Sequence, residues 1–78
     1  MLELNKVAVG EYESPSGDAQ LSISNDEGCF EKDGSLYNFE IKRDNDGNFH
    51  HVEWDLTPSD FHSIEDVILD HLEYMEEG

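Results

Sequence analysis

The chain has 78 residues, of which 36% are hydrophobic and 10% aromatic, so we expect one small domain with a limited core. Twenty Asp and Glu residues stand against four Lys and Arg residues, which gives a formal net charge of −16. This charge argues against direct binding to a phosphate backbone and favours a basic protein surface as partner. No apolar run approaches the ~20 residues of a membrane span, so we expect no membrane role.

The first part of the chain alternates between runs of strand composition and short turn signals. Pro15 and Gly17 predict a turn after the first run, and Gly10 within that run marks a candidate β-bulge. The expected strands cover residues 2–13, 19–24, 29–32, 35–43 and 49–56.

Two Asp-Gly dipeptides predict the strand register, because a two-residue hairpin loop determines which residues face each other. The dipeptide at 33–34 pairs Phe30 with Tyr37. The dipeptide at 46–47 pairs Phe39 with Trp54, Ile41 with Val52, and Tyr37 with Leu56. These pairings place the large apolar side chains on one side of the sheet.

On the other side of the same hairpin, the register places Glu40 directly across from Glu53. Like charges in this position destabilise a sheet. His50 and His51 are consecutive in the strand, so we expect their side chains to point to opposite faces.

The last third of the chain predicts an amphipathic helix over residues 58–77. Thr57 is the expected N-cap, with Asp60 completing a capping box and Leu56 packing on Phe61 as a hydrophobic staple. Ser63 offers a second cap, in which case residues 58–62 form a short turn before the main helix. The predicted fold is α+β: an antiparallel β-meander of four to five strands with one C-terminal α-helix packed on one face.

The outer face of this helix is acidic and carries no basic residue. We expect it, together with the Glu40 and Glu53 side of the hairpin, to bind a partner. Leu69 lies alone among the helix acids and is a candidate anchor or dimer contact. The remaining predicted binding residues are Glu65, Asp66, Asp70, Glu73, Glu76 and Glu77.

No pattern in the sequence predicts catalysis, a cofactor or a metal site. The four His and single Cys match no zinc or metalloprotease spacing. The stripe of His62, Asp66 and Asp70 is more simply a solvated face than a divalent-ion site, and His71 falls on the apolar helix face, where a hydrogen-bonded core histidine is the favoured interpretation. Cys29 cannot form an internal disulfide.

These observations favour a non-enzymatic inhibitor or antidote that presents a nucleic-acid-mimicking surface to a basic nucleic-acid-binding protein. Inhibitors of restriction, CRISPR and DNA-repair enzymes and nuclease-immunity proteins act in this way as classes. The alternative is a small structural or regulatory subunit, dimeric or salt-adapted, whose acidity serves solubility. The N-terminal residues lack the features of a signal peptide, so we expect a cytoplasmic protein.

Overall fold

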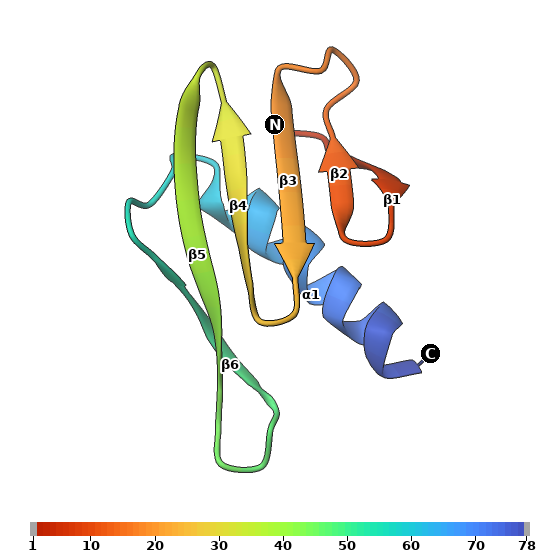
Figure 1. The fold of residues 1–78 in the computed structure, drawn as a ribbon, viewed down its shortest axis with the longest axis vertical. Helices are drawn as coiled ribbons and strands as arrows, with labels where there is room; N and C mark the ends of the chain where they lie inside the picture. The colour runs from red at the N-terminus through yellow and green to blue at the C-terminus, as the bar shows by residue number, and fades with distance from the viewer. Residues whose placement is uncertain (1, 78) are drawn as a thin grey trace.

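A computed structural model describes residues 2–77 of the chain, and the side chains of residues 2–74. Its six strands form one antiparallel sheet in sequence order, followed by a single helix (Figure 1). This confirms the predicted α+β meander, with six strands rather than four or five. The elements are β1 (Asn5–Ala8), β2 (Glu11–Glu13), β3 (Ala19–Ser24), β4 (Glu27–Lys32), β5 (Ser35–Arg43), β6 (Phe49–Trp54) and α1 (Phe61–Glu77).

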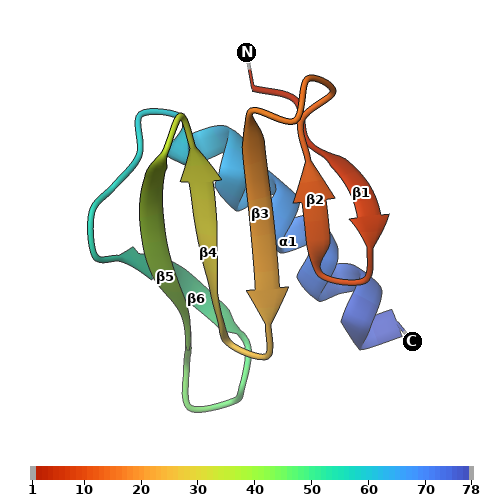
Figure 2. The ribbon, with the colours of Figure 1, turned by 45° about the horizontal axis from the view of Figure 1, so that its top comes forward.

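Helix α1 crosses one face of the sheet obliquely and leaves the other face without any covering element (Figures 1 and 2). Between them lies a core of aliphatic and aromatic side chains, because alternate strand residues and one helix stripe point into the same layer. Its largest fully buried side chains are Leu21, Phe30, Ile64 and Ile68. We call the uncovered side the open face of the sheet.

The expected strand over residues 2–13 is wrong, because the chain turns at Gly10 and forms two strands. Gly10 has φ +76°, a conformation that L side chains rarely adopt. Its carbonyl accepts a hydrogen bond from the Ile23 amide at 2.7 Å. A Cβ on Gly10 would lie 2.4 Å from the Ile23 oxygen, so only glycine fits this close approach of β3.

The predicted register is confirmed for Phe30 with Tyr37, for Phe39 with Trp54 and for Ile41 with Val52. Asp33 and Gly34 both have positive φ, as a type I′ loop requires. The pairing of Tyr37 with Leu56 is wrong, because β6 ends at Trp54 and Leu56 is 65% exposed.

The loop between β5 and β6 is wider than a two-residue turn. The Asp44 carboxylate accepts hydrogen bonds from the amides of Asp46 and Asn48, both at 2.9 Å. The register shifts by one residue beyond Lys42. This irregularity brings the rings of His50 and His51 together, with their centroids 4.8 Å apart and a hydrogen bond between their Nδ1 atoms. The predicted placement of these two side chains on opposite faces is therefore wrong.

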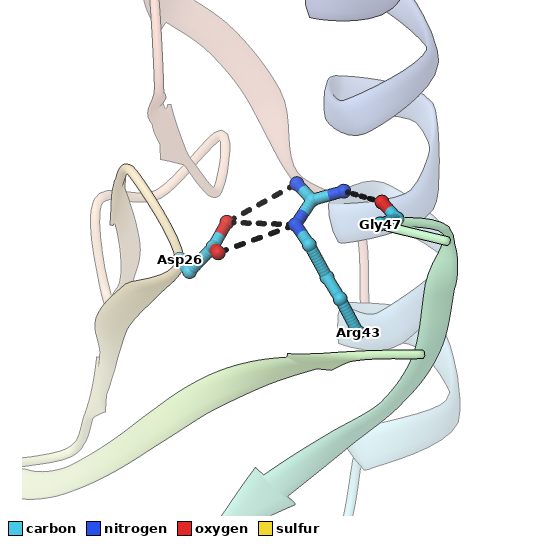
Figure 3. Close-up of polar contacts among 3 residues, drawn as sticks. All are labelled: Asp26, Arg43 and Gly47. Carbon is cyan, nitrogen blue, oxygen red and sulfur yellow. Dashed lines mark hydrogen bonds and ion pairs between the residues drawn. The ribbon is translucent and has the colours of Figure 1, made fainter. Parts of the chain in front are cut away.

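Arg43 ties this loop to the β3–β4 turn (Figure 3). Its Nε donates to both Asp26 carboxylate oxygens, at 3.1 and 3.2 Å, and its Nη1 donates to the Gly47 carbonyl at 2.9 Å. A planar guanidinium presents several donors in fixed directions and so can satisfy two segments at once. The contact orders the end of the long β5–β6 hairpin.

The helix begins at Phe61, later than the expected residue 58, and the Thr57 capping box is not formed. The first helical hydrogen bond runs from the Ile64 amide to the Asp60 carbonyl at 3.2 Å. The Asp60 carboxylate is held instead by Lys32 of β4, at 2.8 Å. The Asp60 side chain therefore contacts the sheet and does not take part in a capping box.

Candidate protein-interaction surfaces

The predicted acidic face of α1 is partly exposed and partly engaged. Asp66, Asp70 and Glu73 are exposed, and Leu69 between them is 36% exposed. Glu65 differs, because its carboxylate accepts a hydrogen bond from Trp54 Nε1 at 3.1 Å and it is only half exposed. The predicted binding residues Glu76 and Glu77 lie outside the described side chains. The helix therefore presents a small acidic surface with one apolar residue.

A second acidic surface covers the open face of the sheet, where cross-strand partners form three parallel rows. The Glu27 row comprises Ser24, Glu27, Glu40 and Glu53. The Cys29 row comprises Glu11, Ser22, Cys29 and Asn38. The Glu31 row comprises Glu13, Gln20, Glu31 and Leu36.

The predicted Glu40 and Glu53 pair is confirmed within the Glu27 row, where the two residues are directly opposite. The Lys42 ammonium contacts the Glu40 carboxylate and lies 3.5 Å from Glu53. The hydrogen bond to Glu40, followed by its charge, raises the pKa of Lys42. Lys42 thus offsets part of a repulsion that the hairpin register imposes.

The helix acids and the open-face acids do not form one surface. Helix α1 packs on the opposite side of the sheet from Glu40 and Glu53, as the buried positions of Ile64 and Ile68 require. A single flat partner surface cannot contact both. The two predicted groups of binding residues therefore define two separate candidate surfaces.

Several open-face acids were not among the residues predicted from the sequence. Glu11 and Glu13 come from β2, which was hidden in the expected strand over residues 2–13. Glu27 and Glu31 flank Cys29 on β4 at alternate positions, opposite in direction to the buried Phe30. That alternation is visible in the sequence and would have found them.

Each Lys and Arg side chain contacts another side chain of the same molecule. Lys32 pairs with Asp60, Lys42 with Glu40 and Glu53, and Arg43 with Asp26. Lys6 lies over the ring of Tyr74, 3.8 Å from its centroid. Most described carboxylates consequently have no cationic neighbour in the molecule itself.

His71 is buried in the core, with 6% of its surface exposed, but it is not the hydrogen-bonded core histidine that was expected. Its Nδ1 has no hydrogen-bond partner among the described residues. Its ring meets the ring of Tyr12 edge-on, with centroids 6.3 Å apart. Burial, and then the charge of Lys6, lower the pKa of His71. Burial, and then the charge of Asp70, raise the pKa of Tyr12.

Within residues 2–77, no three His, Cys, Asp or Glu side chains come together in a way that could hold a metal ion. No helix in the described part of the chain is long and apolar enough to span a membrane. Comparisons with protein-family models, with curated proteins and with solved structures found no match.

Proposed function

We propose that this protein is a non-enzymatic inhibitor or antidote that binds the basic, nucleic-acid-binding surface of another protein. Its carboxylates stand in for phosphates toward the partner's Arg and Lys side chains. Inhibitors of restriction, CRISPR or repair enzymes and nuclease-immunity proteins are the functional classes that this mechanism fits. The protein itself binds no nucleic acid, because its charge has the same sign.

The observation that carries the proposal is the separation of charges. The four Lys and Arg side chains contact other groups of the same molecule, while carboxylates lie on the open face and on the outer face of α1. Like charges on neighbouring strands, such as Glu27 opposite Glu40, oppose folding. The best explanation for keeping these unfavourable pairs is that the negative electrostatic field of the carboxylates attracts a partner.

Affinity capture from a cell lysate at low and at high salt tests the proposal. The expected result is a nucleic-acid-binding protein that is retained at low salt and released at high salt, because exposed ion pairs are screened. Retention of proteins that bind no nucleic acid, or retention unaffected by salt, would contradict it.

A second candidate is a structural or regulatory subunit that dimerises through the free edge of β1. Val7 and Val9 beside this edge are 62% and 61% exposed, and an unpaired strand edge can pair with another chain. A mass measurement over a range of protein concentrations tests it. A monomer at all concentrations would remove this candidate.

A further inference from the structure

Three hollows are lined mainly by residues of the open face. This is the side of the sheet turned toward the viewer in Figures 1 and 2. The volumes of the hollows are about 240, 420 and 310 Å³. The first two share Ser22, and the last two share Asn38. These shared residues place the three hollows next to one another in a line across the strands from β2 to β6, and we call this line the trough.

The trough follows the Cys29 row because the central side chains of this row are short. Ser22, Cys29 and Asn38 form its floor, with the half-buried Cys29 at the centre. Glu11 and Asp55 line its two ends.

Five of the longer side chains on either side of this floor are acidic, and Gln20 and Leu36 complete the Glu31 row. Glu27, Glu40 and Glu53 form one wall, and Glu13 and Glu31 stand on the other. The hollow shape and the charge thus arise from the same alternation of short and long residues.

The dimensions of the trough follow from sheet geometry. Glu27 and Glu31 are four residues apart on β4, so the two walls are separated by roughly 13 Å at ~3.3 Å per residue. The four strand spacings from β2 to β6 give a length of roughly 19 Å at ~4.8 Å each. An α-helix with its side chains is about 10–12 Å across, and about 13 of its residues span 19 Å. The major groove of B-DNA, which admits an α-helix, is about 12 Å wide.

We propose that the trough on the open face receives an Arg- and Lys-rich α-helix of the partner protein, as a DNA groove would. This inference rests on the proposed function and names the surface that performs it. A basic helix laid along the Cys29 row directs side chains at both walls, while short residues on its underside meet the floor. A second copy of this chain does not fit, because it would bring like charges together.

Two matched double variants separate the two acidic surfaces. Glu27→Gln with Glu31→Gln removes one exposed carboxylate from each wall of the trough. Asp66→Asn with Glu73→Gln removes the same charge from the outer face of α1. None of the four side chains forms an ion pair in the described structure, and all are exposed, so neither variant should unfold the domain.

The probe is a synthetic helical peptide of about 13 residues built from Arg, Lys and Ala, titrated at low salt into isotopically labelled protein and followed by NMR. If the peptide binds in the trough, the NMR signals of the Ser22, Cys29 and Asn38 amides should shift. The β4 variant, Glu27→Gln with Glu31→Gln, should bind the peptide roughly fivefold more weakly. The α1 variant should change affinity less than about twofold. The β4 variant loses two exposed ion pairs with the peptide, whereas the α1 variant loses none in the trough, and these two cases give the two factors.

Cys29 supplies an independent readout, because it is the only cysteine in the chain and lies on the trough floor. The bound peptide should slow alkylation of the Cys29 thiol. Unchanged alkylation, with shifts confined to Asp66, Asp70 and Glu73, would overturn the trough but leave the proposed function standing on α1. Absence of any binding to the basic peptide at low salt would overturn both.

Discussion

Glu40 of β5 and Glu53 of β6 face each other directly across the open face, and the ammonium of Lys42 lies between their carboxylates. The hairpin register that packs the buried Phe39 and the partly buried Trp54 on the core side leaves these two acids opposed on the other. Burial of the aromatic pair outweighs the exposed repulsion, because exposed charges interact through water and apolar burial is not screened. The acidic wall is thus a consequence of the core.

Replacing Lys42 with Gln should lower the midpoint of thermal unfolding, because the Glu40 and Glu53 carboxylates then repel without a cation between them. The loss should shrink at high salt. In a Glu53→Gln background, the same Lys42 substitution should cost less. An equal loss in both backgrounds would mean that Lys42 acts through packing and not through its charge.

The Gly10 turn makes a prediction about close backbone approach. Gly34→Ala should cost about 1–2 kcal/mol, the strain of positive φ alone, because nothing lies near its Cβ position. Gly10→Ala should cost roughly 1–3 kcal/mol more, since its Cβ would meet the Ile23 carbonyl oxygen. Urea denaturation of both variants measures the difference. Equal losses would contradict the close contact between the β1–β2 turn and β3.

Neighbouring residues of α1 test which helix face is buried. Ile68→Val should reduce the free energy of unfolding by about 0.5–1.5 kcal/mol, because Ile68 is fully buried. Leu69→Ala removes more atoms but should change it by less than about 0.5 kcal/mol, since the side chain reaches solvent. Chemical denaturation reports both, and the reverse order would place the helix in a different rotation on the sheet.

His71 makes stability depend on pH. Burial lowers its pKa below the ordinary value of 6.5, so the folded state favours the neutral ring. The unfolded chain binds the proton more readily, and stability contributed by neutral His71 is lost as pH falls below about 6.5. Acid also relieves repulsion among the carboxylates, which acts in the opposite direction.

The His71→Leu variant isolates the histidine from this general charge effect. It should be more stable than the unmodified protein by roughly 1 kcal/mol near neutral pH, because Nδ1 no longer lies buried without a partner. The advantage should grow between about pH 7 and pH 5. A constant difference over this range would show that His71 protonates equally well in the folded state.

The sequence predicted the meander and most of its register, because the turn at Asp33 and Gly34 and the alternating apolar residues agree on one pairing. It did not reveal the β1–β2 hairpin, since Val7 and Val9 have strand composition even though both are exposed beside the Gly10 turn. The need for glycine there comes from β3, which is distant along the chain.

The helix start and the binding surfaces were less accessible to sequence reasoning for a similar reason. Asp60 matches a capping pattern, but its carboxylate is taken by Lys32, a contact that depends on the folded sheet. The acids of the open face become one surface only when strands from four hairpins lie side by side. The helix acids were predicted as binding residues because they lie close together in the chain.

The proposed mimicry is tested most directly by competition between this protein and a short DNA or RNA duplex for a captured nucleic-acid-binding partner. Fluorescence anisotropy of the labelled duplex reports its release from the partner as this protein is added. We expect complete displacement of the duplex, with weaker displacement by the Glu27→Gln, Glu31→Gln variant. A ternary complex, in which the partner holds the duplex and this protein together, would contradict it.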